Sequence, residues 1–115
     1  TYIYLVGGVN DDGLVTTVDV YNPSNDTWQT KSSQMPIGTN SLGCAYYNNK
    51  IYIVGFSNDP RNLVYSTTSD SWAYLESLPA TYGRVNPAVS IYNGKLYVMG
   101  GCCNYNDTNR QYDLN

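Results

Sequence analysis

The sequence predicts an all-β chain built from repeated antiparallel sheets, and three observations support this prediction. Helical periodicity is absent, and short runs rich in Val, Ile, Leu and Tyr alternate with clusters of Asn, Gly, Asp and Pro. An apolar run that ends in glycine recurs at 2–8, 51–55 and 96–101. The first glycines of these runs lie 48 and then 45 positions apart. Repetition at such a period indicates a supersecondary unit that stacks on copies of itself.

The strands follow in order along each unit, and we letter them A to D from the middle unit, which is complete. In the first unit, strands B, C and D are expected at 2–6, 17–21 and 27–30. In the middle unit, strands A to D are expected at 42–47, 51–55, 63–66 and 71–75. The last unit supplies strands A, B and C at 87–92, 96–99 and 110–113.

Two-residue turns are expected between strands A and B. Asn48-Asn49 separates them in the middle unit, and Asn93-Gly94 separates them in the last. Asn and Gly tolerate the positive φ that both central positions of such a turn require. The sequence therefore predicts two tight antiparallel hairpins.

The repeated residues together resemble the kelch repeat. Glycines follow strand B, a tyrosine lies in strand C, a tryptophan follows seven positions later, and Met35-Pro36 or Leu78-Pro79 precedes the next strand A. The resemblance covers essentially the whole chain and implies kelch-type β-propeller blades, each a four-stranded antiparallel sheet. The residues that carry it are Gly7, Gly8, Tyr21, Trp28, Gly55, Tyr65, Trp72, Gly100, Gly101 and Tyr112.

On this resemblance the chain is a partial propeller over 1–115. Residues 1–40 supply blade strands B to D, 41–86 a complete blade, and 87–115 blade strands A to C. A ring needs about 4 to 8 blades. We therefore expect either an excerpt of a longer ring or a piece completed by other copies of the chain, because open blade edges and faces favour aggregation.

The motif residues are expected to have structural roles. Trp28 and Trp72 should be buried between neighbouring blades, and the hydroxyls of the strand C tyrosines should find backbone partners. Phe56 stands where the second glycine is expected, so the middle blade must turn differently there, because positive φ is costly for a side chain. Thr39 stands where the last unit has Arg84, which argues against a repeated role for arginine.

Composition argues against several classes of function. Six Lys and Arg against nine Asp and Glu give a net charge of −3, which does not suit a nucleic-acid surface. No apolar run is long enough to predict membrane insertion. Histidine is absent, which removes the commonest neutral-pH base and metal ligand, and we predict no catalytic residue, no metal site and no cofactor.

The cellular compartment stays open between cytoplasmic and extracellular. Charged residues make up 13% of the chain against about 25% in typical soluble domains. Asn25 and Asn106 begin triplets of the glycan-acceptor type, although turn-rich sequence also produces such triplets by chance. These features favour the extracellular side slightly. Three cysteines leave the redox state open; for Cys102-Cys103 free thiols are favoured over a soft-metal site or a vicinal disulfide.

Recognition residues are expected in the loops between strands B and C, at 9–16, 57–62 and 102–109, which lie at one end of the propeller in this topology. Simple turn formation is the alternative explanation for their Asn, Asp and Gly residues. Arginine and aromatic side chains are the better anchors, so Arg61 and Tyr105 rank first, together with Arg84 from the neighbouring connection between strands D and A. The other candidates are Asn10, Asp11, Asp12, Asn58, Asp59, Asn106, Asp107 and Arg110.

The leading hypothesis is a non-catalytic protein-binding module that presents these loops to a protein partner. The resemblance implies roles such as the substrate-recognition part of a ubiquitin-ligase adaptor, or a scaffold. One alternative is a structural extracellular or filament-forming glycoprotein. Another is part of a propeller enzyme similar to galactose oxidase or a sialic-acid isomerase, although the copper type needs imidazole ligands that this chain lacks.

Overall fold

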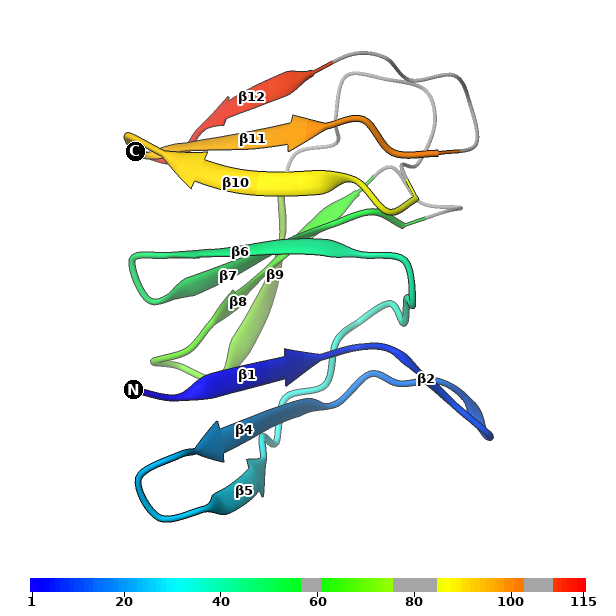
Figure 1. Cartoon of the computed structure of the whole chain (residues 1–115), viewed down its shortest axis with the longest axis vertical. Coiled ribbons are helices and arrows are strands. Elements are labelled where there is room, and N and C mark those ends of the chain that lie inside the picture. Colours follow the sequence, from blue (N-terminus) through cyan, green and yellow to red (C-terminus); the bar gives the residue numbers. More distant parts are fainter. Residues whose placement is uncertain (57–60, 76–84, 103–108) are drawn as a thin grey trace. The chain divides into compact units, whose positions relative to one another are not determined.

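The computed structural model describes residues 1–56, 61–75, 85–102 and 109–115, and these residues form strands and turns (Figure 1). The chain divides into two compact units, Thr1–Asn40 and Ser41–Asn115. The predicted all-β class is confirmed, and neighbouring strands in the sheets that the structure describes are antiparallel, as expected. Every strand of the three large sheets lies within one residue of its expected position.

The first unit holds one three-stranded sheet and a small hairpin. The sheet has the order β1 (Ile3–Val6), β4 (Val18–Asn22), β5 (Thr27–Thr30), and all neighbours are antiparallel. The hairpin pairs β2 (Val9–Asn10) with β3 (Gly13–Leu14) in a segment that we expected to be a loop. Val18, Val20 and Met35 are the buried hydrophobic residues that the structure describes in this unit.

The second unit holds two antiparallel sheets. The middle sheet has the order β6 (Gly43–Tyr47), β7 (Lys50–Val54), β8 (Asn62–Ser66), β9 (Ser71–Leu75). The last sheet has the order β10 (Ala88–Tyr92), β11 (Lys95–Met99), β12 (Arg110–Asp113). Both predicted hairpin turns are confirmed, since φ is +48° and +60° at Asn48 and Asn49 and +49° and +69° at Asn93 and Gly94.

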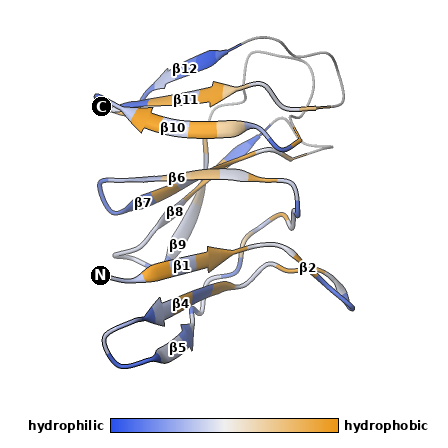
Figure 2. Ribbon diagram, viewed as in Figure 1, coloured by the Kyte–Doolittle hydropathy of each residue, from blue (hydrophilic) through white to orange (hydrophobic). Residues whose placement is uncertain are grey.

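The two sheets of the second unit pack face to face. Tyr52 and Val54 of β7 and Leu96 and Val98 of β11 form one buried cluster. In Figure 2 the apolar colouring is strong along β10 and β11, which belong to this stack. Because successive side chains of a strand point to opposite faces, each strand commits every second residue to this contact. The stack is the core of the second unit.

A glycine lets the two sheets approach closely. A Cβ added at Gly43 of β6 would lie 2.5 Å from Cγ2 of Val89 and 2.6 Å from the carbonyl oxygen of Pro87. Neither neighbour is the flexible end of a long side chain. The close approach of β6 to the start of β10 therefore requires a residue without a side chain.

A tyrosine, an aspartate and a tryptophan form the same arrangement in two sheets. Tyr65 lies directly opposite Trp72, with ring centroids 5.0 Å apart, and its hydroxyl donates to Oδ1 of Asp70 at 2.8 Å. Tyr21 and Trp28 repeat this with a centroid distance of 4.9 Å, and the Tyr21 hydroxyl donates to Asp26 at 3.0 Å. We expected backbone partners for the strand C tyrosines, whereas the hydroxyls of Tyr21 and Tyr65 donate to aspartate side chains. In each turn the aspartate has a positive φ, and its carboxylate accepts the hydrogen bond of the tyrosine hydroxyl.

The two tryptophans differ in burial. Trp72 is partly buried, whereas Trp28 is 60% exposed, so the prediction that Trp28 is buried is wrong. A neighbour in the same sheet covers only one side of an indole, and full burial requires a second sheet packed on that face.

The turn after strand B in the middle sheet differs from the corresponding turns in the first and last sheets, as expected from Phe56 at the position of the second glycine. Gly7 and Gly8 have φ of +70° and +107°, and Gly100 and Gly101 have +61° and +106°. In the turn after β7 of the middle sheet, Gly55 has a φ of +111°, whereas Phe56 at the next position does not have positive φ and is buried. The expectation of a different turn is confirmed, because Phe56 keeps an ordinary φ and contributes its ring to the core.

Candidate functional site

The first predicted recognition loop is the turn of the β2–β3 hairpin. The backbone N–H of Asp12 donates to Oδ1 of Asn10 at 3.0 Å, so the Asn10 side chain builds the turn. Asp11 and Asp12 are exposed at its tip, where two carboxylates meet solvent. At its base, the N–H of Val15 donates to the carbonyl of Gly8 at 2.9 Å. The hairpin therefore presents two negative charges on an ordered support.

Arg61 lies beside the middle sheet, immediately before β8. Its side chain is exposed, and its Cζ lies 4.5 Å from the centroid of the Tyr74 ring on β9. Stacking of this kind holds an exposed arginine in place at a gain of about 0.5–1 kcal/mol. Tyr74 is itself 49% exposed, so the pair presents an aromatic face and a cation together.

Arg110 begins β12, opposite Val98 in the register. It is partly buried, and its Nε is buried with no hydrogen-bond partner among the described residues. An arginine in this position is less accessible to a partner than Arg61.

The remaining loop candidates lie outside the described residues. These are Asn58, Asp59, Arg84, Tyr105, Asn106 and Asp107. Their assignment to partner binding, like that of Asp11, Asp12, Arg61 and Arg110, stays a prediction.

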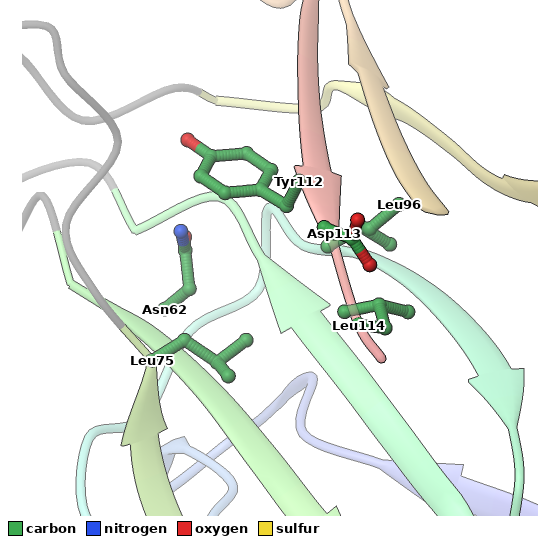
Figure 3. Close-up of a pocket in the computed structure, with 6 residues that line it drawn as sticks. All are labelled: Asn62, Leu75, Leu96, Tyr112, Asp113 and Leu114. Atoms are coloured by element: carbon green, nitrogen blue, oxygen red, sulfur yellow. The ribbon is translucent and has the colours of Figure 1, made fainter. Parts of the chain in front are cut away.

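A cavity between the two sheets of the second unit was not predicted from the sequence. It has a volume of about 240 Å³, which is below the range of about 300–1,000 Å³ usual for drug-sized ligands and suits one side chain. Figure 3 shows the ring of Tyr112 and the side chains of Asn62 and Leu75 at its walls. The lining residues are Asn62, Leu75, Leu96, Tyr112, Asp113 and Leu114.

The chemistry of this cavity is mainly apolar. Leucine side chains come from β9, from β11 and from the residue after β12, and Asn62 is buried at the start of β8. The residues come from two sheets, so no local spacing in the sequence could group them. The alternation of apolar residues in each strand was the only available signal, and it does not report how sheets stack.

The structure describes two of the three cysteines, Cys44 and Cys102. Cys44 carries a free thiol on β6, and partial burial raises its pKa above the ordinary value. Cys102 is disulfide-bonded, so the interpretation of the Cys102-Cys103 pair as free thiols is wrong for Cys102; Cys103 lies outside the described residues. In the described ranges, no three His, Cys, Asp or Glu side chains gather in the way a metal ion needs.

Asn25 is exposed in the turn between β4 and β5. The hydroxyl of Thr27 donates to its Oδ1 at 2.7 Å, which places the two polar groups of the acceptor triplet together. No helix in the described parts of the chain has the length and apolar character needed to cross a membrane.

Comparison with known proteins gives a family match. A family model described as the Kelch motif matches residues 1–35 and 83–115, more than half of the chain. Residues 36–82, which include Thr39 and Phe56 at the two departures from the repeat, lie outside the matched residues. The solved structure of YjhT has a TM-score of 0.76 over 87% of this chain and 42% of YjhT, at 20% identity, which shows a shared fold.

Three relatives are similar in sequence. Kelch repeat and BTB domain-containing protein 1 of cowpox virus (strain Brighton Red) is 29% identical over 98% of this chain and 20% of its own length. The protein of that name from horsepox virus is 35% identical over 86% of this chain and 18% of its own length. An F-box/kelch-repeat protein of Arabidopsis thaliana is 32% identical over 80% of this chain and 26% of its own length. The chain thus spans about a fifth to a quarter of these relatives.

Proposed function

Because the chain belongs to the kelch-repeat family, we propose that it is a non-catalytic module that binds a protein partner through the loop end of its sheets. The relatives combine kelch repeats with a BTB domain or an F-box, which supports a role in a larger assembly. On this proposal the chain recognises a target protein, as the substrate-recognition part of an adaptor does.

The stacked pair of Arg61 and Tyr74 is the observation that carries this proposal. Arginine and tyrosine are enriched among residues that dominate binding energy at protein interfaces. Here they lie 4.5 Å apart and both are exposed, so that a partner can cover them together. Tyr74 belongs to β9, and Arg61 directly precedes β8 of the same four-stranded sheet; a surface that is already arranged before binding limits the entropy lost on binding.

The opposite end of the same sheet offers a matched control. Lys50 and Arg61 are both exposed cations, but Lys50 follows the β6–β7 turn and pairs with Ser66, whereas Arg61 precedes β8 near the end of β7. A partner held at the loop end covers Arg61 and leaves Lys50 free.

Photo-crosslinking tests which end is covered. A photoreactive amino acid is placed at position 61 or at position 50, and the proteins crosslinked in cells are identified by mass spectrometry. The proposal predicts a specific crosslinked protein from position 61 alone, and with the purified partner a loss of about 1–2 kcal/mol of binding energy in Arg61→Ala. Equal crosslinking from both positions, or crosslinking from position 50 alone, contradicts it.

The enzyme alternative has a separate test. Copper binding and turnover of galactose or sialic-acid substrates are measured on the longest form of the protein that can be expressed. We expect neither. Turnover that survives purification and is lost in a loop variant would replace the binding-module proposal.

One observation favours a second candidate function, a structural extracellular glycoprotein. Asn25 is exposed and begins an Asn-Asp-Thr triplet of the glycan-acceptor type, and its side chain accepts a hydrogen bond from the Thr27 hydroxyl. Mass spectrometry of the chain secreted from eukaryotic cells would show a glycan-bearing peptide around Asn25. An unmodified Asn25 peptide removes this candidate.

A further inference from the structure

The turn between β8 and β9, here called the hydroxyl turn, is built almost wholly from residues that carry a hydroxyl. Five of the six residues at 66–71 are Ser or Thr, and Asp70 is the sixth. The exposed hydroxyl residues of the turn are Thr68, Ser69 and Ser71. The hydroxyl turn therefore places several nucleophilic oxygens at the surface of the complete four-stranded sheet.

Only two of these side chains are needed to build the turn, as the corresponding turn of the first sheet indicates. That turn uses Asn22 as the acceptor for a backbone N–H and Asp26 as the acceptor for the Tyr21 hydroxyl. The hydroxyl turn uses Ser66 and Asp70 in the same two ways. The turn of the first sheet forms with different residues at the other positions, so the remaining hydroxyls are not required for this conformation.

Ser69 lies at the centre of the contacts between these hydroxyls. Its Oγ donates to Oγ of Ser66 at 2.8 Å and lies 2.7 Å from Oγ of Ser71. Oγ1 of Thr68 lies 3.2 Å from the same Ser66 oxygen. Four hydroxyl oxygens thus gather in one place, and the exposed Ser69 contacts two of the other three directly.

An exposed cation borders this group of hydroxyls. Lys50 of β7 lies opposite Ser66, and Ser66 lies opposite Ser71 of β9. Residues directly opposite each other on neighbouring strands share one face, with their Cβ atoms about 4.5–5.5 Å apart. The N–H and the hydroxyl of Thr67 both donate to the carbonyl oxygen of Asn49, at 2.9 and 3.0 Å, which ties the turn to the residue before Lys50. An anionic group on this face meets one ammonium and several hydroxyl donors.

We propose that Ser69 is a phosphorylation site, the acceptor of a phosphoryl group that a protein kinase transfers from ATP. Oγ of Ser69 attacks the γ-phosphorus, and the new Oγ–P bond forms as the bond to the ADP oxygen breaks. The hydroxyl proton passes to the catalytic base of the kinase. The product carries about −1.5 to −2 charges at pH 7. The hydroxyls of Ser66 and Ser71 donate to the phosphate oxygens, and the ammonium of Lys50 offsets the added charge.

Mass spectrometry of the chain expressed in eukaryotic cells, before and after phosphatase treatment, tests the modification. We expect phosphate on Ser69 and its loss in Ser69→Ala, whose folding is checked by circular dichroism. Ser24 is the matched control, because it is an exposed serine in the corresponding turn of the first sheet, and it should stay unmodified. An unmodified Ser69 would overturn the proposal. Equal phosphate on Ser24 and Ser69 would also overturn it, because exposure alone would then explain the modification.

Phosphoserine introduced genetically at position 69 or at position 24 tests whether the turn holds the phosphate. Phosphorus NMR at a series of pH values should give a lower pKa for the second ionisation of the phosphate at 69, because Lys50 and the hydroxyl donors favour the dianion. Asp70 and Asp26 place one carboxylate in each turn, so that contribution is matched. Lys50→Ala should remove most of the difference. Equal pKa values at the two positions, or a difference that Lys50→Ala leaves unchanged, would overturn the assignment of this turn as a phosphate site.

Discussion

Trp28 and Trp72 occupy the same register position and have the same tyrosine and aspartate neighbours, yet their burial differs. The difference shows that the Tyr–Asp–Trp arrangement forms within a single sheet. It fixes the ring positions through one aromatic contact and one charge-assisted hydrogen bond. Burial of the indole then depends on the neighbouring sheet.

Removing each indole should therefore have different consequences. Trp72→Ala is expected to lower the free energy of unfolding by about 3 kcal/mol, at the lower end for loss of a large core aromatic because Trp72 is only partly buried. Trp28→Ala is expected to lower it by about 1 kcal/mol, close to the value of the Tyr21 ring contact alone. Urea denaturation of both variants measures this, and equal losses would contradict the account.

The burial of Tyr52 makes the free energy of unfolding depend on pH. Burial of Tyr52 raises its pKa above the ordinary value of 10.0, and the nearby Tyr47 adds to the effect. As pH rises past about 10, the phenol of the unfolded chain loses its proton before the folded one does. The stabilising contribution is complete below the unfolded pKa and is lost as pH rises through the folded pKa.

The stability of the wild-type chain should accordingly fall as pH rises above about 10, and Tyr52→Phe should fall less steeply. Tyr46→Phe is the control, because Tyr46 is 60% exposed on the neighbouring strand. Urea denaturation midpoints measured between pH 8 and pH 11 show how steeply the stability of each protein falls with pH. The same slope in Tyr52→Phe and the wild type is the result that this explanation does not allow.

At the scale of elements, the sequence predicts strands well for a physical reason. Period-two alternation and turn residues such as Asn48-Asn49 act over a few positions, so they set strand limits locally. The β2–β3 hairpin was missed because two-residue strands are too short for alternation to be visible. The aspartate partners of Tyr21 and Tyr65 were missed because they depend on the left-handed conformation of Asp26 and Asp70 in each turn.

Gly43 sets the spacing between two elements. A Cβ there meets Val89 and the Pro87 carbonyl at 2.5 and 2.6 Å, which is closer than side chains approach. Gly43→Ala should therefore push β6 away from β10 and lower the free energy of unfolding by about 1–3 kcal/mol. Cys44→Ala, at the next and exposed position, should change it by less than about 0.5 kcal/mol. A neutral or stabilising Gly43→Ala, measured by thermal or urea unfolding, counts against this tight packing.

At the scale of the whole molecule, the candidate site is less predictable than the fold. The family resemblance rests on residues such as Gly7 and Tyr21 that recur along the chain at a regular spacing, so the amino-acid sequence alone reveals it. The cavity beside Tyr112 joins Asn62 and Leu75 to the last sheet, and only the stacking of two sheets brings them together. Loop candidates such as Asp11 and Arg61 do not recur from unit to unit, so no repeated pattern supports them and they remain predictions.

Face-to-face stacking of the middle and last sheets is the central structural claim about the second unit, and a double-mutant cycle measures it. Val54→Ala and Val98→Ala, on facing strands of the buried cluster, should interact by at least about 0.5 kcal/mol in the free energy of unfolding. Val54→Ala combined with Tyr92→Ala, on the outer face of the last sheet, should be additive. Additivity in the first pair would contradict the stacked arrangement, whereas coupling confined to the first pair is the result that it predicts.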